Sequence, residues 1–182
     1  TSGGSPILIS HLGRPKGKVI DKFSLKHVVD CLSNHLGQQV HFCKDCIGES
    51  TKEFCNNLAE GKVVLLENLR FYEEETSGDV GFSKKLSELG DVYVNDAFGT
   101  AHRAHASTTV VASFFPNDKL FGYLIETELQ SISRVIRDGQ PPKTAILGGA
   151  KISGKIDVIT SLMNKVDKII IGGGMSFTFI KA

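Results

Sequence analysis

The sequence contains a strand-to-loop transition that reads Val92-Tyr93-Val94-Asn95-Asp96-Ala97-Phe98-Gly99-Thr100-Ala101-His102-Arg103-Ala104-His105. Its apolar start predicts a short strand. The two histidines and the arginine are costly to bury, so the loop is expected to face a solvent cleft at a strand end. Their charge suits an anionic ligand, and Gly99 lets the backbone approach it. Taken by itself, the segment is equally consistent with a polar loop that contains a structural glycine.

Four further apolar runs predict strands that end in the same kind of loop, at residues 7–10, 63–66, 145–147 and 169–171. The loops after them read His11-Leu12-Gly13-Arg14-Pro15, Glu67-Asn68-Leu69-Arg70-Phe71, Gly148-Gly149-Ala150-Lys151 and Gly172-Gly173-Gly174-Met175. Each contains glycine, arginine, histidine or lysine. Because ligands of open α/β sheets bind beyond the carboxyl ends of the strands, these loops are candidate binding segments.

Helical spacing of apolar residues alternates with these strands, as in Leu25, Val28, Val29, Leu32 and Leu36. Ser24 is a good N-cap for that helix, and Gly37 ends it. Shorter helices are expected over residues 51–58 and 82–89. Further helices are expected over 125–136 and from an opening at residues 152–155 to about 163. The alternation predicts an α/β fold of parallel strands with helices on both faces.

Composition and net charge disfavour nucleic acid and anionic membranes as partners. With 182 residues, 41% hydrophobic, 23% charged and a formal net charge of +1, the chain has no overall field that would attract nucleic acid or an anionic membrane. No apolar run approaches the roughly 20 residues that span a bilayer. Cys43 and Cys46 form a C-x-x-C without a second pair for zinc, so packed, reduced thiols are the default expectation.

Several polar residues have a simple structural interpretation. The acidic run of Glu73, Glu74 and Glu75 is typical of a solvated face and has no evident metal partner. His27 and His35 lie off the apolar stripe of their helix and are expected at the surface. Asp96 is expected to fix its loop rather than to act as a base.

The cations after the strands predict two kinds of anion site. Arg14, Arg70 and Arg103, together with His11, His102 and His105, suit a small, multiply charged ligand such as a phosphorylated acid. Lys151 and Lys155 lie four residues apart at an expected helix N-terminus, which suits a polyphosphate. Neither glycine-rich loop matches a known nucleotide fingerprint, which disfavours a dinucleotide-dependent dehydrogenase.

Together, the five loop motifs resemble the phosphoglycerate kinase family in order and spacing over nearly the whole chain. The resemblance implies a Rossmann-like three-layer αβα fold with a mainly parallel sheet, plus the beginning of a second similar domain. It implies a phosphoglycerate-binding N-terminal domain over 1–122, an interdomain helix over 123–138, and the start of a nucleotide-binding domain over 139–182.

The implied activity is reversible phosphoryl transfer between 1,3-bisphosphoglycerate and ADP, which gives 3-phosphoglycerate and ATP in glycolysis. The substrate residues would be His11, Leu12, Gly13, Arg14, Arg70, His102 and Arg103, and the nucleotide residues Gly149, Ala150, Lys151, Lys155, Gly173 and Gly174. Lys151 and Arg103 would be catalytic. A carboxylate acceptor is already ionised at neutral pH, so no general base is required.

The resemblance also implies where this chain departs from the family. A first strand that carries substrate-contacting residues, and most of the nucleotide domain with its magnesium-binding aspartate, have no counterpart in the 182 residues. Mg²⁺ is expected to arrive with ADP or ATP, and the 182 residues alone are expected to show negligible turnover. A cytoplasmic protein, monomeric when full length and without nucleic-acid or membrane partners, is expected. The alternative is a non-catalytic anion-binding or interaction module on the same scaffold.

Overall fold

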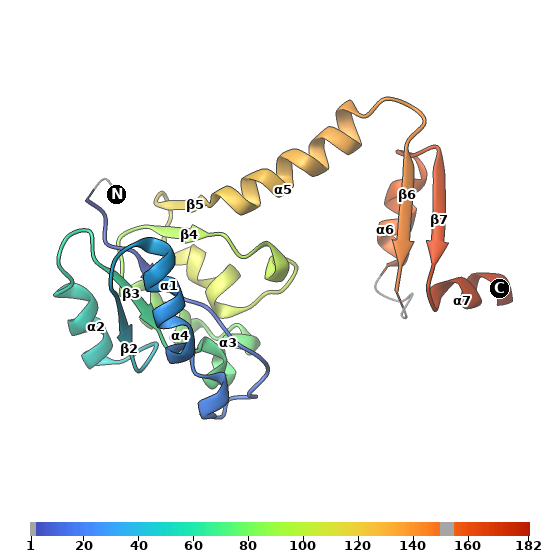
Figure 1. Ribbon diagram of the computed structural model, residues 1–182. Helices are drawn as coiled ribbons and strands as arrows, with labels where there is room; N and C mark the ends of the chain where they lie inside the picture. Colours follow the sequence, from blue (N-terminus) through green and yellow to red (C-terminus); the bar gives the residue numbers. More distant parts are fainter. Residues whose placement is uncertain (1–2, 150–154) are drawn as a thin grey trace. The chain divides into compact units, whose positions relative to one another are not determined.

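The computed structural model describes residues 3–149 and 155–182. They belong to two compact units, an N-terminal and a C-terminal one, with the division between Ile125 and Glu126. The strands are β1 (Ile7–Leu8), β2 (Val40–Cys43), β3 (Val63–Leu66), β4 (Tyr93–Asn95), β5 (Lys119–Phe121), β6 (Thr144–Gly148) and β7 (Lys168–Gly172). The α-helices are α1 (Val29–Leu36), α2 (Glu49–Asn56), α3 (Glu73–Ser77), α4 (Val80–Ser87), α5 (Tyr123–Ser133), α6 (Ile156–Met163) and α7 (Met175–Lys181). Strands and helices alternate along the chain (Figure 1).

Each recorded strand pair among the described residues is parallel, as the sequence pattern predicts. The N-terminal unit contains a three-stranded sheet in the order β1-β3-β2 and a separate two-stranded sheet of β4 and β5. In the C-terminal unit, β6 pairs with β7. Parallel pairing directs the loops that follow β1 and β3 to the same end of their sheet.

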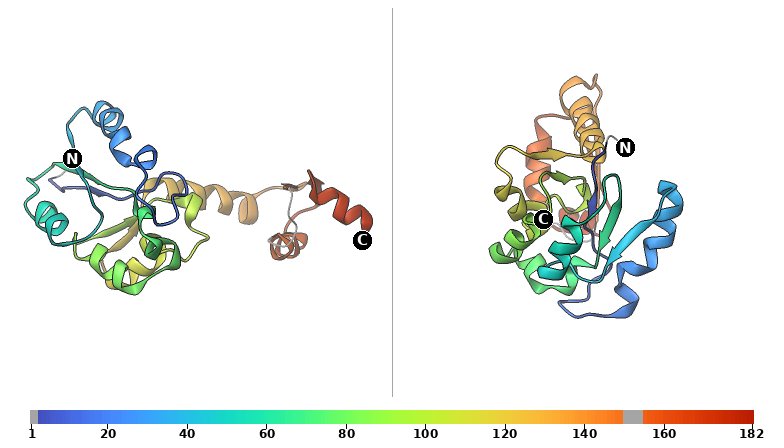
Figure 2. Two further views of the ribbon diagram at one scale, coloured as in Figure 1. Left: turned by 90° about the horizontal axis from the view of Figure 1, so that it is seen from below. Right: turned by 90° about the vertical axis from the view of Figure 1, so that its left-hand side faces the viewer.

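The central strand β3 is buried on both faces, which explains its continuous apolar run. Val64 and Leu66 pack on one side with residues of α4, including Phe82 and Leu86. The alternate residues Val63 and Leu65 pack on the other side with the segment that leads into α1. The right-hand view of Figure 2 shows α1 on one side of the strands and α3 and α4 on the other. The three-layer α/β prediction is therefore confirmed for the N-terminal unit.

The helix that precedes β2 begins at Ser24, as predicted, but its first turn is a 3₁₀ helix. The Ser24 hydroxyl accepts a hydrogen bond from the Lys26 backbone N–H, and residues Leu25–Val28 (η2) lead into α1. Gly37 ends α1 with a φ of 63°, a left-handed conformation that glycine adopts without a steric penalty. His27 and His35 are exposed, as predicted.

Several short elements were not predicted, among them α3 in the acidic run. Strand β5 was missed because its three residues are all exposed and form no apolar run. The segment after the Asn95–His105 motif folds into η5 (Ala106–Val110, a π-helical turn) and η6 (Val111–Phe114, a 3₁₀ turn). Ala106 and Val111 in these turns reach the same core as Val64 and Leu66, so they attach the motif to the sheet.

Candidate functional site

The loops after β1 and β3 lie against each other through backbone hydrogen bonds. Leu69 N donates to Ser10 O over 3.1 Å, and Gly17 N donates to Arg70 O over 3.2 Å. The Arg70 guanidinium adds a bond from Nη1 to Gly13 O over 2.9 Å. The adjacent parallel strands thus bring the Arg14 loop and the Arg70 loop into one structure, although they lie far apart in the sequence.

Asn68 is the buried centre of this structure. Its Nδ2 donates to Leu12 O and to Phe23 O, both over 2.8 Å, and its Oδ1 accepts the Arg70 backbone N–H over 3.0 Å. The side chain is fully buried. A buried amide that meets its hydrogen bonds in this way specifies one arrangement of the surrounding backbone.

Glu67 ties the same loop to the start of the following helix. Its Oε2 accepts the Ser24 hydroxyl over 2.6 Å, and its Oε1 accepts the Leu25 backbone N–H over 2.8 Å. Sequence reasoning placed Glu67 and Asn68 in a motif but assigned them no role. Their partners lie about 40 to 60 residues away, so no local pattern indicates these bonds.

Gly13 occupies the tight end of the first loop. It has a φ of 66°, and a Cβ at this position would lie 2.5 Å from the Phe23 ring. Glycine is therefore required both by the left-handed backbone and by the close approach of the ring. The neighbouring Leu12 and Arg14 are exposed, and His11 is half-buried.

The third loop presents Arg103 at the surface on a fixed backbone. The hydroxyls of Thr108 and Thr109 donate to Arg103 O over 3.1 and 3.2 Å. The Arg103 Nε lies 3.3 Å from His102 Nε2. His105 is 8% exposed and serves as the N-cap residue of η5, so the loop presents Arg103 outward and His105 inward.

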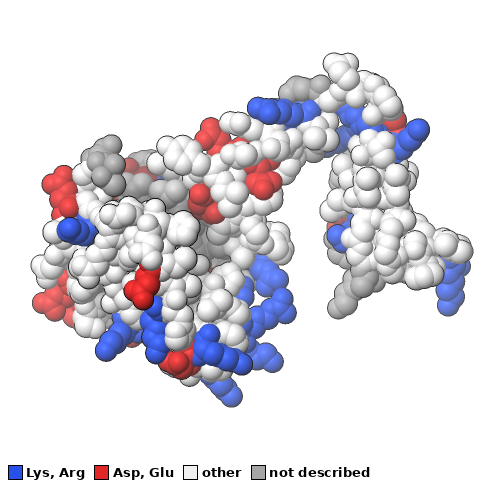
Figure 3. Space-filling view, in the orientation of Figure 1, with Lys and Arg blue, Asp and Glu red and all other residues white. Residues whose placement is uncertain are grey.

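The charges of Arg14 and Arg103 both act on the Arg70 guanidinium, so the three arginines lie within electrostatic range of one another. The pKa of Arg70 is lowered by burial and by the charges of Arg103 and Arg14, while Glu75 opposes this change. The residues of this arginine–histidine cluster are His11, Arg14, Arg70, His102, Arg103 and His105. In Figure 3, Lys and Arg side chains gather along the lower part of the N-terminal unit.

Two imidazoles of the cluster, His11 and His105, lie in the positive field of the arginines. Burial lowers the pKa of His11, and the charges of Arg70 and Arg103 lower it further. Burial likewise lowers the pKa of His105, with further lowering by Arg70, Arg103 and His102. Concentrated like charge of this kind is unfavourable without an anion and becomes favourable when one binds.

One donor of Arg70 has no protein partner. Its Nε is buried and lacks a hydrogen bond among the described residues. An unsatisfied buried donor is costly, especially a charged one, so this N–H is available to an oxygen from outside the protein, either of water or of a ligand. Arginine presents its donors in a planar fork that matches phosphate and carboxylate oxygens.

The expectation that the whole acidic run faces solvent is wrong for Glu75. Glu73 and Glu74 are exposed, but Glu75 is only 3% exposed. Its carboxylate accepts the Ser107 hydroxyl over 2.7 Å and the Ser107 N–H over 3.0 Å. The partner lies 32 residues away, so the sequence around the run contains no sign of this bond.

Asp96 lies beside the third loop and makes a structural contact. Its Oδ1 accepts the Ile125 backbone N–H over 3.0 Å. A Cβ at Gly122 would lie 2.3 Å from the Asp96 Cγ, so the glycine makes room for the carboxylate. These contacts agree with a role in fixing local structure rather than in proton transfer.

The glycine-rich loops of the C-terminal unit also meet. Met175 N donates to Gly149 O over 3.0 Å, and a Cβ at Gly173 would lie 3.2 Å from both N and O of Gly149. Lys155 precedes α6, and its Cε would lie 3.3 Å from a Cβ at Gly149. Gly174 is exposed next to them. Lys151 and Ala150 lie outside the described residues.

The four cysteines do not belong to the arginine–histidine cluster. All four cysteines are free, and Cys46 is buried with its Sγ donating to Glu67 O over 2.8 Å. Burial raises the pKa of the Cys46 thiol well above its usual range, so it is unreactive. No group of three or more potential metal ligands occurs among residues 3–149 and 155–182.

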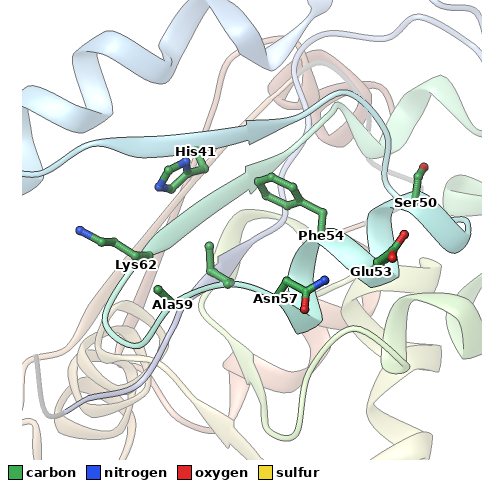
Figure 4. Close-up of a pocket in the computed structure, with 8 residues that line it drawn as sticks. His41, Ser50, Glu53, Phe54, Asn57, Ala59 and Lys62 are labelled. Carbon is green, nitrogen blue, oxygen red and sulfur yellow. The ribbon is translucent and has the colours of Figure 1, made fainter.

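A cavity of about 590 Å³ lies between β2, α2 and the turn before β3. In Figure 4, His41 and Phe54 face each other across it, with Lys62 at its margin. None of the cluster residues lines this cavity. Within the described part of the chain, no helix has the length and apolar character of a membrane span.

Comparison with known proteins gives the family. The family model for phosphoglycerate kinase matches residues 1–182. Phosphoglycerate kinases of Gloeothece citriformis and Chlorobaculum tepidum are 52% and 53% identical over 182 and 181 residues. Each comparison covers 100% of this chain but 45% of the relative, so the chain spans about half the length of these relatives.

Solved structures agree with the sequence comparisons. The structure of phosphoglycerate kinase from Coxiella burnetii matches with a TM-score of 0.79 at 38% identity, over 96% of this chain and 43% of that chain. The structure of phosphoglycerate kinase from Pyrococcus horikoshii matches with a TM-score of 0.77 at 31% identity, over 92% and 42%. With the match of the family model over every residue, the chain belongs to the phosphoglycerate kinase family.

Proposed function

We propose that this chain provides the phosphoglycerate-binding part, and the start of the nucleotide-binding part, of a glycolytic phosphoglycerate kinase. The observation that carries the proposal is the packing of the Arg14 loop against the Arg70 loop through Arg70 bonds to Gly13 and Gly17. The charges of Arg14 and Arg103 both act on Arg70 in this arrangement. Its substrates would be 3-phosphoglycerate with ATP, or 1,3-bisphosphoglycerate with ADP. Membership of the family and the identities of about 52% to full relatives support the same activity.

In the proposed reaction, a carboxylate oxygen of 3-phosphoglycerate attacks the terminal phosphorus of ATP. A new P–O bond forms, the bond to the bridging oxygen of ADP breaks, and that oxygen leaves with ADP. The reverse direction returns the group from the acyl phosphate to ADP. No proton is removed from the attacking carboxylate, so positioning and charge neutralisation are the tasks left to the protein.

The proposed roles follow the two sets of loops. His11, Leu12, Gly13, Arg14, Arg70 and His102 bind the phosphoglycerate, and Arg103 both binds it and stabilises the transferred group. Gly149, Ala150, Lys155, Gly173 and Gly174 flank the nucleotide phosphates, with Lys151 as the second catalytic cation. The meeting of Gly149, Gly173 and Lys155 supports the nucleotide assignment, because backbone and cation converge where phosphate oxygens could be held. Mg²⁺ would arrive with ADP or ATP and help neutralise their phosphates.

The proposed domain limits are 1–122 for phosphoglycerate binding, 123–138 for an interdomain helix and 139–182 for the nucleotide side. A cytoplasmic monomer is proposed for the full-length enzyme. A non-catalytic anion-binding module on the same scaffold would share the arginine–histidine cluster, so the chemistry of the bound anion separates the two functions.

Titration calorimetry of the 182-residue chain with 3-phosphoglycerate tests the proposal. Loss of one charge-assisted contact in R70A or R103A should weaken binding by about 1.5–3 kcal/mol, or roughly 10- to 150-fold. R137A is the matched control, because Arg137 is an exposed arginine outside the cluster. Unchanged affinity in both cluster variants, or equal binding of inorganic sulfate and 3-phosphoglycerate, would count against the kinase substrate and favour the general anion module.

A further inference from the structure

A buried carboxylate lies beneath the arginine–histidine cluster. Glu75 is the third glutamate of α3, and only this one turns inward, where both its oxygens bond to Ser107. Gly78, which ends α3, approaches the same loop so closely that a Cβ there would lie 2.6 Å from Ala104 O. Helix α3 is therefore fitted against the loop that carries Arg103 and His105.

The bond to Ser107 completes the start of η5. The N-cap residue of η5 is His105, whose own side chain does not cap the turn. The Glu75 carboxylate instead accepts the free Ser107 N–H, so α3 supplies the cap from outside. A capping carboxylate also suits the positive end of a helical turn.

The capped turn in turn holds the Arg103 backbone. The hydroxyls of Thr108 and Thr109, both in η5, donate to Arg103 O. The N–H groups of Thr109 and Val110 donate to His105 O over 3.0 and 3.3 Å. A continuous set of hydrogen bonds thus runs from Glu75 through η5 to the backbone at Arg103 and His105.

Glu75 also provides negative charge among the cations. Its Oε1 lies 3.7 Å from His105 Nδ1, and its charge opposes the lowering of the Arg70 pKa. The other titratable groups that interact with it are Tyr93 from β4 and Cys46 from the loop before α2. Burial raises the pKa of Glu75, whereas the two Ser107 hydrogen bonds and the charge of Arg70 oppose this change and help to stabilise the carboxylate.

We infer that Glu75 is a positioning residue for the anion site: it caps η5 from outside and thereby orients Arg103 and His105, without contacting the anion. The identity of the anion as 3-phosphoglycerate rests on the proposed function, whereas the capping role does not. A carboxylate in direct contact with a phosphorylated acid would repel it, so an indirect role is the one that its charge allows.

A test without ligand uses E75Q and E75A, with E74Q as the matched control because Glu74 is exposed in the same helix. In E75A, the Ser107 amide should exchange with solvent at least about tenfold faster than in the parent chain, because its acceptor is gone. In E75Q, NMR titration should show a lower pKa for His105, because the imidazolium loses a nearby negative charge. E74Q should change neither. The inference is overturned if E75Q and E74Q titrate alike and Ser107 exchange in E75A is unchanged.

A second arm measures 3-phosphoglycerate affinity by calorimetry. Positioning predicts binding about tenfold weaker in E75A and no change in E74Q. E75Q should recover part of the affinity, because its amide oxygen can still accept the Ser107 N–H. Removal of charge alone would instead strengthen anion binding in both glutamine variants. Tighter or unchanged binding in E75A overturns the inference. If the parent chain binds no 3-phosphoglycerate, the proposed function fails, and the exchange and titration results still decide the role of Glu75.

Discussion

At the scale of single residues, Asn68 connects the two loops that carry Arg14 and Arg70. In N68A, the carbonyls of Leu12 and Phe23 and the Arg70 N–H would lose their partner inside the protein. We expect the free energy of unfolding to fall by about 2–4 kcal/mol, measured by urea denaturation. N34A, which truncates an exposed asparagine of α1, should change it by less than about 0.5 kcal/mol. Equal effects of the two variants would show that the buried amide does not hold the loops.

The lowered pKa values of His11 and His105 predict how the stability of the folded state varies with pH. The pKa values of His11 and His105 are lowered in the folded state, chiefly by burial and then by the arginines. Their neutral forms therefore favour folding above the unfolded value of about 6.5, and this contribution is lost as the pH falls through the folded values.

We expect urea denaturation to show decreasing stability below about pH 6.5, and the combined variant H11Q/H105Q to show a flatter dependence. H35Q, which alters an exposed imidazole on α1, should retain the parent dependence. If the free energy of unfolding of H11Q/H105Q varied with pH as it does in the parent chain, the two histidines would not be the source of the pH dependence.

At the scale of elements, substitution of Gly78 tests whether stability requires the close approach of α3 to the Arg103 loop. In G78A, the methyl group would meet Ala104 O at 2.6 Å and the backbone would keep a φ of 72°. G61A is the matched control, because Gly61 has a φ of 74° and no atom within 4 Å of the added Cβ. Both substitutions incur a left-handed penalty of about 1–2 kcal/mol.

Only G78A should incur the additional displacement of backbone. We expect it to lower the free energy of unfolding by at least about 1 kcal/mol more than G61A does in the same denaturation series. Equal losses would imply that α3 and the loop can separate without consequence.

The elements differ in how well sequence predicts them, and the reason is the distance to the partners that stabilise them. Strand β3 was predicted because a strand that is buried on both faces consists of a continuous run of apolar residues, and such a run is visible in the sequence. Strand β5 was not predicted because its three exposed residues form neither an apolar run nor an alternation of apolar and polar residues. The inward orientation of Glu75 was missed because Ser107 lies 32 residues away, and local composition correctly describes only Glu73 and Glu74.

At the scale of the whole molecule, each of the two units has its own set of loops. The N-terminal unit contains the arginine–histidine cluster, and the C-terminal unit contains the meeting glycine loops. The sequence predicted the chemical character of both sets of loops, cationic in the first and glycine-rich in the second, from the residues that follow each strand. It also predicted that these loops are binding segments, because parallel strands direct the residues after them to one edge of a sheet. The bonds of Asn68, Glu67 and Glu75 that hold the loops in place were not predicted, since they join distant segments.

The central claim is that three arginines from separate loops act on one anion. The most direct measurement is an NMR titration of arginine Nε–H signals with 3-phosphoglycerate, in which Arg70 Nε begins without a protein partner. The account predicts that the signals of Arg14, Arg70 and Arg103 shift together and saturate at one common ligand concentration, while Arg137 does not respond. Signals of the three arginines that shift at different concentrations, or that remain unchanged, would contradict it.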